Sequence, residues 1–372
     1  MTAHQIVRVH RVLAQSPSDL SGVKALVEQG LLNPKNIVAV MGKTEGNGCV
    51  NDHTRHFASM SWCHYLSAHL NCTPEQAHDQ VALVMSGGTE GVLSPHFTVF
   101  SRQWVKPPSQ RKEARLAIGV AQTRAFEPWE IGRMAQIEET AQAVRMAMRE
   151  AHIASSEDVH FVQIKCPLLT MEKIQAAQKA SQSVVTHETY ESMAYSRGAS
   201  ALGVALALGE VHADQLGDQV VLRDMHLFSS RASASAGIEL ENNVVVVLGM
   251  SSASSSELMI DHTVMKDAID AASVTALVSK YRAAESLDTS KHPKAFKLVN
   301  VLAKAEASPN GQIRNLRHTI LDDSDINATR HARAAVGGVL ASITGDTALY
   351  VSGGAEHQGP AGGGPVCILF GS

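Results

Sequence analysis

The sequence predicts an α/β fold of three similar repeats arranged around a pseudo-threefold axis, with one central site. Its 372 residues suffice for three units of about 120 residues each. A motif of Ser, a small residue, Gly, any residue and Glu follows an apolar strand three times, at 86–90, 235–239 and 352–356. An earlier apolar strand in each repeat ends in lysine, at positions 43, 165 and 304. These matched positions make internal repetition the first property of the chain.

A single Ser-Gly turn would indicate little, because serine and glycine are common in ordinary turns. Three copies carry more weight, since an arginine lies between the lysine and the serine each time. The arginines are Arg55, Arg197 and either Arg330 or Arg333. Because the lysine, arginine and serine match equally well in all three repeats, we expect the three sets to meet at one site. A linear solenoid is less favoured, since its repeats are usually smaller.

The first repeat is predicted over residues 1–104. An alternating apolar pattern indicates a strand at 6–13, and apolar runs indicate later strands that reach Lys43, Ser86 and Phe100. Helices are expected between these strands, at 22–29, around 55–70 and after Thr73. Alternation of strands and helices is typical of an α/β unit.

The other two repeats, predicted over 112–250 and 256–372, have the same order of elements. A polar, proline-containing stretch at 102–111 is expected to link repeats one and two, and the serine-rich stretch at 251–256 to separate repeats two and three. Strands are predicted at 115–123, before Lys165, at 244–248, at 258–264, before Lys304 and at 365–370. Helices are predicted at 137–151, 198–206, 266–283 and 333–341.

Composition narrows the class of protein. A formal charge of −4 and a pI near 6.5 provide no basic field for nucleic acid. No stretch is long and apolar enough to cross a bilayer, and the first residues lack the pattern of a secretory signal. The five cysteines are odd in number and include no Cys-x-x-Cys. We therefore expect a cytoplasmic protein with free thiols.

The recurring lysine and serine indicate a Ser-Lys dyad. Serine is a weak nucleophile and needs a base, and the chain has no Gly-x-Ser-x-Gly elbow. Lysine can act as that base only when neutral, which requires burial or nearby positive charge to lower its pKa from about 10.4. Three lysines and three arginines at one site would supply such repulsion.

The three lysines have different neighbours along the chain. Glu45 and Glu306 lie two residues after Lys43 and Lys304, where they would keep the ammonium charged. Lys165 is succeeded by cysteine, proline and leucine, so Lys165 with Ser235 is the predicted catalytic pair. The backbone N–H of each Ser-Gly or Ser-Ala step could hold a carbonyl oxygen. The expected ligand is small, flat and anionic, with several carbonyl groups.

Four stretches resemble one family, the cyanuric acid hydrolases and barbiturases, which open cyclic amides. The similar stretches are 42–48, 85–91, 197–203 and 352–360, and the resemblance covers essentially the whole chain. It implies three α/β repeats around a central active site, in a homotetramer. It also implies no organic cofactor.

The resemblance implies roles for individual residues. Ser235 would be the nucleophile and Lys165 its base. Arg330 matches the surroundings of Arg55, whereas Arg333 matches the pattern around Arg197, and Arg333 is favoured. The implied substrate contacts are Arg55, Ser86, Gly87, Arg197, Ser235, Ala236, Arg333, Ser352 and Gly353, with Lys43 and Lys304.

A structural metal site is also implied, at Glu306, Ala355, Gln358, Gly359, Pro360 and Gly363. Its oxygen-rich character suits Mg²⁺ or Ca²⁺ better than zinc. A different metal site at His53, His56 and His64 is less favoured, because no His-Glu-x-x-His occurs and the spacing fits no common ligand set.

The implied reaction is attack of Ser235 on a ring carbonyl, ring opening and hydrolysis of the acyl-enzyme. Cyanuric acid would give carboxybiuret, then CO₂ and biuret, and barbituric acid would give ureidomalonate. Cyanuric acid matches the threefold pattern better, because barbituric acid has one CH₂ in place of an NH. The alternatives are a barbiturase, a non-catalytic binder of small molecules, and a metal-dependent amidohydrolase that uses the three histidines.

Overall fold

A computed structural model describes residues 3–108, 113–287 and 296–371. Residues 109–111 of the predicted linker and the predicted boundary at 112 lie outside these residues, as do both chain ends. The first half of the linker prediction is wrong, because strand β4 continues to Val105. Its residues pair with the first strand, as in Arg102 opposite Val7, so polar side chains here occupy a strand and not a linker.

Three four-stranded sheets share one topology, as the repeats predicted. In each sheet the first strand is antiparallel to the fourth, the fourth is antiparallel to the second, and the second is parallel to the third. In this order the strands are β1 (His4–Leu13), β4 (His96–Val105), β2 (Ile37–Thr44) and β3 (Ala82–Gly87); β5 (Arg115–Gln122), β8 (Val244–Ser251), β6 (Val159–Cys166) and β7 (Ala232–Ala236); and β9 (Leu258–Met265), β14 (Gly364–Gly371), β10 (Lys297–Ala305) and β13 (Tyr350–Gly353). The predicted α/β class is confirmed.

Matching helices connect the strands. Those before the lysine strands are α1 (Ser21–Glu28), α4 (Met134–Glu150) and α7 (Ala271–Leu287), and those before the serine strands include α2 (His53–Leu70), α6 (Thr189–Leu208) and α8 (Ala328–Thr344). Additional elements are α3 (Pro74–Gln80), α5 (Met171–Lys179), a hairpin of β11 (Gln312–Ile313) and β12 (Leu316–Arg317), and 3₁₀ helices at Pro34–Asn36, Pro128–Glu130, Ser156–Asp158, Ala213–Gln215 and Asp218–Val220.

Local sequence fixes the ends of the long helices. Asp52 and Asn327 accept backbone hydrogen bonds at the starts of α2 and α8, which satisfies donors that a helix start leaves free. Gly209 and Gly345 adopt left-handed conformations directly after α6 and α8, where glycine carries no Cβ penalty. These capping residues fix where α2 and α8 begin and where α6 and α8 end.

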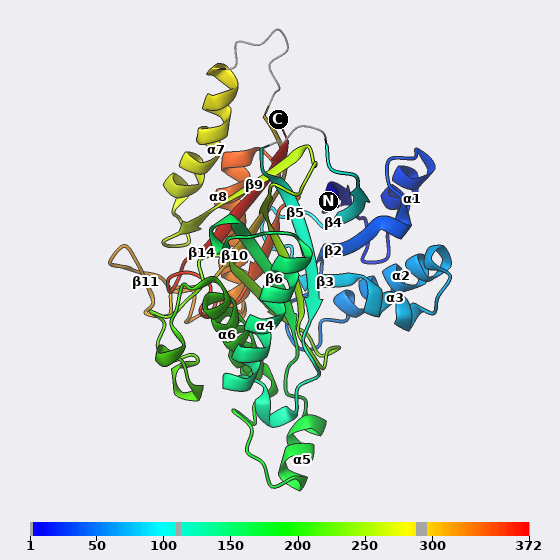
Figure 1. Cartoon of the computed structure of the whole chain (residues 1–372). Coiled ribbons are helices and arrows are strands. Elements are labelled where there is room, and N and C mark those ends of the chain that lie inside the picture. The colour runs from blue at the N-terminus through cyan, green and yellow to red at the C-terminus, as the bar shows by residue number, and fades with distance from the viewer. Residues whose placement is uncertain (1–2, 109–112, 288–295, 372) are drawn as a thin grey trace.

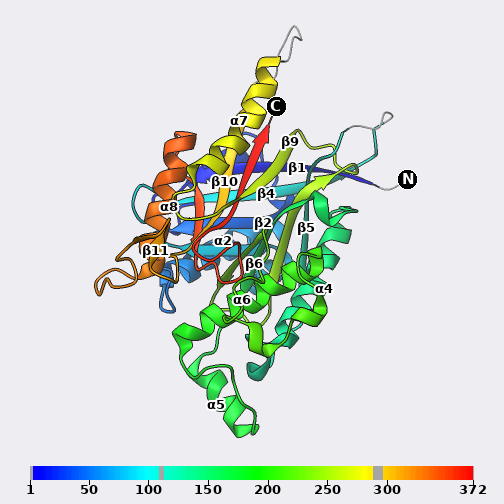
Figure 2. The ribbon, with the colours of Figure 1, turned by 90° about the vertical axis from the view of Figure 1, so that its left-hand side faces the viewer.

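The sheets lie inside and the helices outside, with the helices of the three repeats projecting in three directions (Figures 1 and 2). The outer face of each sheet packs against its own helices in a separate core. The inner faces meet in one further core, to which all three repeats contribute. This shared core includes Met41 and Phe100 from repeat one, Phe161 from repeat two, and Leu302 and Tyr350 from repeat three.

Strand alternation directs the motif residues to the centre of the molecule. In β10, Val301 and Ala303 belong to the outer core, whereas Leu302 belongs to the shared core. Side chains two residues apart in a strand share a face, so Lys304 also points inward. The same argument applies in the other sheets, because Met41 precedes Lys43 and Phe161 lies four residues before Lys165.

Replacement of Leu302 should show how strongly the shared core supports the fold. Leu302 is 0% exposed, so Leu302→Ala should lower the free energy of unfolding by about 2–5 kcal/mol through lost burial and a cavity. Leu316→Ala is the control, because Leu316 is 75% exposed. Urea denaturation would measure both, and equal losses would contradict the importance of this core.

Candidate active site

The three lysine-serine pairs occupy the same register. Lys43 lies opposite Ser86, Lys165 opposite Ser235 and Lys304 opposite Ser352 on neighbouring parallel strands. Each pair stands near the end of its two strands, where the chain leaves the sheet. One geometric unit is therefore repeated three times.

The three serines meet at one point. The Oγ of Ser352 lies 3.0 Å from that of Ser235 and accepts a hydrogen bond from Ser86 at 3.5 Å. The three lysines are each 1% exposed. Groups separated by more than a hundred residues thus form one buried cluster, which is the convergence that the sequence predicted.

A small pocket opens above this cluster. It is lined by Gly48, Arg55, Ser86, Gly87, Met193, Arg197, Ser235, Ala236, Arg333, Ser352 and Gly353. Nine of the predicted substrate contacts are in this set, and Lys43 and Lys304 lie directly behind their serines. Gly48 and Met193 were missed, because neither belongs to a repeated motif. The pocket volume is about 20 Å³, close to the space that one water needs.

Arg333, and not Arg330, reaches the pocket. Arg333 is 3% exposed and lines the pocket, whereas Arg330 lies one helical turn earlier in α8 and is not among the lining residues. The match of Arg333 with Arg197, through the shared pattern of arginine, a small residue and alanine, therefore aligned α8 with α6 correctly.

Burial makes the three lysines unusual bases. It lowers the pKa of Lys43 well below the ordinary value, with Arg333 contributing in the same direction. It lowers the pKa of Lys304 to about 7, with Arg197 contributing. The pKa of Lys165 also falls through burial, although the Glu239 carboxylate opposes the change. The lysines can therefore lose a proton far more readily than a surface lysine.

The hydrogen bonds of the three lysines differ. The Nζ of Lys304 donates to the backbone oxygens of Ala234 and Gly353 at 2.9 and 3.0 Å and to Ser352 Oγ at 3.2 Å. The Nζ of Lys43 donates to Ser86 Oγ at 3.3 Å and to the Gly87 oxygen at 3.4 Å.

Lys165 has a different set of partners. Its Nζ donates to the Met85 oxygen at 3.0 Å and lies 3.3 Å from Oε1 of Glu239. Among the described residues, no hydrogen bond joins Lys165 to Ser235. The second pair is thus the one in which the lysine does not already donate to its serine.

The arginines and the motif glutamates form pairs between repeats. Arg333 of repeat three grips Glu90 of repeat one through two hydrogen bonds, with Nε donating at 2.7 Å. Arg197 of repeat two grips Glu356 of repeat three in the same way, with Nε donating at 2.8 Å. These bidentate pairs fix the guanidinium planes over the pocket.

The third pair of this ring is not formed. Symmetry would place Glu239 on Arg55, but Glu239 contacts Lys165. Arg55 donates instead to the backbone oxygens of Ala236 at 3.0 Å and Cys49 at 2.6 Å, and its buried Nε has no hydrogen-bond partner. The second repeat therefore breaks the threefold arrangement at its glutamate.

The expectation that Glu45 and Glu306 hold the ammonium groups of Lys43 and Lys304 is wrong. Glu45 lies beyond the last residue of β2 and is exposed, and Glu306 accepts from the Gly362 N–H and has only a minor raising effect on the pKa of Lys304. The carboxylate that contacts a lysine is Glu239, next to Lys165, so the expectation that Lys165 lacks a carboxylate neighbour is also wrong. The prediction assumed that residues two apart lie on one face of a strand. This does not apply here, because β2 and β10 end before Glu45 and Glu306.

The loop predicted to hold a metal lies against a buried carboxyl group. Burial and, to a smaller extent, the nearby Glu356 carboxylate raise the pKa of Glu306 to about 7. Gln358 is committed elsewhere, because its Oε1 accepts from the Ala234 N–H at 2.7 Å. A cation would relieve the cost of ionising Glu306, so this carboxyl fits a hard cation, whereas the Gln358 side chain does not. The backbone groups recorded beside the carboxyl are N–H donors, and the oxygens of Ala355 and Pro360 already accept hydrogen bonds within the loop.

The histidines predicted as a rival metal site do not gather. Within the described ranges, the one group of three metal-binding side chains is His160, Asp261 and His262. Lys280 and Tyr281 already donate to Asp261, and Arg231 lies against His262, so positive charge and occupied acceptors oppose a cation there.

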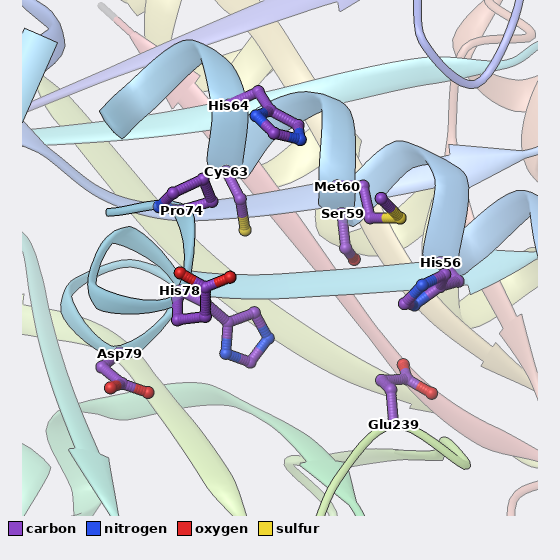
Figure 3. Close-up of a pocket in the computed structure, with 10 residues that line it drawn as sticks. His56, Ser59, Met60, Cys63, His64, Pro74, His78, Asp79 and Glu239 are labelled. Carbon is purple, nitrogen blue, oxygen red and sulfur yellow. The ribbon is translucent and has the colours of Figure 1, made fainter. Parts of the chain in front are cut away.

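A larger cavity of about 310 Å³ lies beside α2 and α3, separate from the serine cluster. Figure 3 shows His56 and His64 on its α2 side, His78 and Asp79 near α3, and the Glu239 carboxylate pointing in from below. This cavity contains no Ser-Lys pair. It does, however, reach the carboxylate that contacts Lys165.

Two other sequence expectations concern the whole chain. All five cysteines are free thiols. Among the helices in the described part of the chain, none combines the length and apolar character needed to span a membrane.

Comparisons with known proteins show the family to which the whole chain is similar. Residues 8–371 match the AtzD/TrzD family of amidohydrolase ring-opening proteins. The chain is 56% identical to a cyanuric acid amidohydrolase of Pseudomonas sp. (strain ADP), over 98% of each chain, and 55% identical to one of Bradyrhizobium diazoefficiens, over 98% of this chain and 97% of the relative. A solved cyanuric acid hydrolase structure superposes with a TM-score of 0.93 at 54% identity, over 99% of this chain and 100% of that one. The hydrolase from A. caulinodans gives a TM-score of 0.88 at 50% identity, over 98% of both chains.

Two glycine substitutions should change stability in opposite directions. Gly88 has a φ of +104°, and a Cβ there would overlap the Arg333 guanidinium, so Gly88→Ala should cost about 1–3 kcal/mol. Gly338 lies inside α8 with open space at its Cβ position, so Gly338→Ala should add about 0.5–1 kcal/mol. Thermal unfolding measures both, and an unchanged Gly88→Ala variant would contradict the close fit.

Proposed function

Since this chain belongs to the AtzD/TrzD family of ring-opening amidohydrolases, we propose that it hydrolyses cyanuric acid with a single Ser-Lys dyad. The product would be carboxybiuret, which loses CO₂ to give biuret. One observation carries the proposal: three serines and three arginines from three repeats line one pocket, with a buried lysine behind each serine. The relatives named as cyanuric acid amidohydrolases support the choice of substrate.

The pocket suits a planar ring with threefold symmetry. Cyanuric acid alternates three carbonyl and three N–H groups, so each repeat can meet one carbonyl with equivalent groups. In this proposal Arg55, Arg197 and Arg333 and the backbone of Ser86-Gly87, Ser235-Ala236 and Ser352-Gly353 hold the carbonyl oxygens. Backbone donors of this kind also stabilise the oxyanion that develops during attack. Barbituric acid would leave one repeat facing a CH₂ group.

Donor counting supports Lys165 as the base. An ammonium has three N–H donors, and Lys304 has three acceptors within reach. Lys43 and Lys165 each have two, but Lys43 already donates to its own serine, Ser86, whereas the partners of Lys165 are the Met85 oxygen and Glu239. A neutral amine can satisfy both with its two N–H groups and keep its lone pair, and Ser235 is the residue paired with Lys165 on the neighbouring strand.

The proposed reaction begins with proton transfer inside the dyad. The Oγ–H bond of Ser235 breaks, its proton moves to Lys165 Nζ, and Oγ bonds to a ring carbonyl carbon. The ring C–N bond then breaks as Lys165 returns the proton to the leaving nitrogen. Water repeats the sequence on the acyl-enzyme, with Lys165 taking the water proton and returning it to Ser235. Lys43 and Lys304 stay as hydrogen-bond donors.

The bound ring would lie in the pocket above the three serines. Met193 and the three arginines line this pocket, so they would border the ring and exclude water from the reacting groups.

We also propose a structural Mg²⁺ or Ca²⁺ held by Glu306 and backbone oxygens of the loop from Ala355 to Gly363. The cation would keep Glu306 ionised and fix the loop that carries Glu356, the partner of Arg197. A homotetramer is proposed as well, and light scattering would measure the mass.

Removal of the two dyad groups should abolish turnover. Ser235→Ala and Lys165→Ala should each lower kcat by at least about 10³-fold, because either change removes the nucleophilic step. Ser86→Ala is the matched control and should lower kcat by about 10-fold, the effect of one weakened contact. Release of biuret and CO₂ measures the rates. Equal residual rates in Ser86→Ala, Ser235→Ala and Ser352→Ala would contradict a single nucleophile.

Substrate choice should be tested with both rings side by side. Cyanuric acid should give a higher kcat/KM than barbituric acid, because it presents a carbonyl and an N–H group to each repeat. A higher value for barbituric acid would assign the chain as a barbiturase. Binding of cyanurate without release of biuret or CO₂ would show a non-catalytic binder.

The proposed cation should appear in thermal stability as well as in activity. Mg²⁺ or Ca²⁺ should raise the Tm of the wild-type protein, because a ligand that binds only the folded state stabilises it by mass action. Glu306→Ala should remove this response. An equal rise in Tm for the variant would contradict a site at Glu306.

A further inference from the structure

The glutamate of the Ser-x-Gly-x-Glu motif has one kind of partner in two repeats and a different partner in the third. Glu90 and Glu356 each bind an arginine of the preceding repeat. Glu239 does not pair with the equivalent arginine, Arg55, whose buried Nε has no hydrogen bond and lies 3.8 Å from Asp52, and it contacts Lys165 at 3.3 Å instead. Among the three buried lysines, Lys165 alone forms an ion pair with a described residue. The three similar repeats therefore differ at the lysine that the proposed reaction uses.

We propose that Glu239 is a positioning residue that makes Lys165 and Ser235 the reactive pair. This inference rests on the proposed function and names the cause of its asymmetry. Glu239 orients the amine of Lys165 and stabilises the ammonium that forms when Ser235 gives up its proton. Among the described residues no carboxylate contacts Lys43 or Lys304, because Glu90 and Glu356 are held by arginines and act on these lysines only from a greater distance.

The charge on Glu239 is favoured by two cations. Burial raises the pKa of Glu239, but Lys165 and Arg55 outweigh it and hold the pKa at about 2 while Lys165 carries its proton. When Lys165 is neutral, the Arg55 guanidinium still favours the ionised carboxylate. A fixed negative charge at 3.3 Å stabilises the charged product of proton transfer more than the neutral reactant, which lowers the barrier.

Arg55 limits this effect and keeps the lysine usable as a base. Its guanidinium lowers the pKa of Lys165, in opposition to Glu239, and Cys166 is the other ionisable group close to the lysine. With all these groups the pKa of Lys165 is still below its ordinary value. The glutamate thus moderates the effect of burial without restoring a permanently charged lysine.

The large cavity gives solvent access to this carboxylate. Glu239 is 16% exposed and lines the cavity, together with the titratable groups His56, Cys63, His64, Glu75, His78 and Asp79. Figure 3 shows the carboxylate directed toward α2. Small solutes in this cavity can therefore reach the Glu239 carboxylate from a side other than the substrate pocket.

The first test is the pH dependence of kcat/KM in Glu239→Gln. Glu239 raises the pKa of Lys165, and the base must be neutral, so loss of the charge should move the acidic limb to lower pH. The rate on the plateau should fall at least about 10-fold, because the ammonium loses its stabilising neighbour. A change that merely loosened the structure would lower the plateau and leave the limb in place.

Glu90→Gln is the matched control. It removes the equivalent glutamate of repeat one and frees Arg333, but its charge acts on Lys43 and not on the proposed base. Its acidic limb should stay where the wild-type limb lies. Glu239→Asp, which keeps the charge, should recover part of the lost rate and return the limb toward the wild-type position.

Rescue provides a second measurement. Glu239→Ala leaves space at the floor of the large cavity, so formate should raise its rate in a saturable way, whereas uncharged formamide should not. Glu90→Ala should show no such rescue. This comparison remains informative if the glutamine variant folds poorly.

The possible failures are distinguishable. An unmoved acidic limb in Glu239→Gln and no formate rescue, with Lys165→Ala inactive, would overturn the role of Glu239 and leave the Ser-Lys mechanism standing. A limb that moved in Glu90→Gln instead would overturn both, because it would assign the base to Lys43.

Discussion

The burial of three lysines at the ends of three inward-facing strands is the constraint on which the site depends. A buried ammonium is expensive unless it is paired or loses its proton. Here each lysine is supplied with backbone oxygens, a serine or a carboxylate, and each pKa is lowered by burial. The shared core is what makes this arrangement possible, because it excludes water from the inner ends of all three sheets.

In the proposed function, the threefold repetition recognises the substrate and the departure from it selects the catalytic pair. Three equal sets of donors suit a ring that presents the same groups three times. Three equal bases would not direct attack to one carbonyl, since all of them would titrate and donate alike. Their partners differ: Lys304 has three acceptors, Lys43 donates to its own serine, and Lys165 has a carboxylate neighbour.

Contacts between repeats hold the site together. The pair of Arg333 and Glu90 joins repeats three and one, and the pair of Arg197 and Glu356 joins repeats two and three. The main chain takes part as well, since Lys165 donates to Met85 of repeat one and Lys304 to Ala234 of repeat two. No single repeat can therefore assemble the pocket, and the two glycines Gly88 and Gly354 are needed because the guanidinium groups lie directly over them.

The repeats, the α/β class, the strand ends that carry lysine and serine, and the helix that carries each arginine were all predictable from the amino-acid order. These features depend on local periodicity and on succession along the chain, which a sequence records directly. Three-dimensional coordinates were needed to show that Glu239, and not Glu45 or Glu306, lies beside a lysine, and that Gly48 and Met193 line the pocket. Those contacts join segments distant in the chain, and a side chain that leaves a strand end can turn toward any repeat, so spacing alone does not specify its partner.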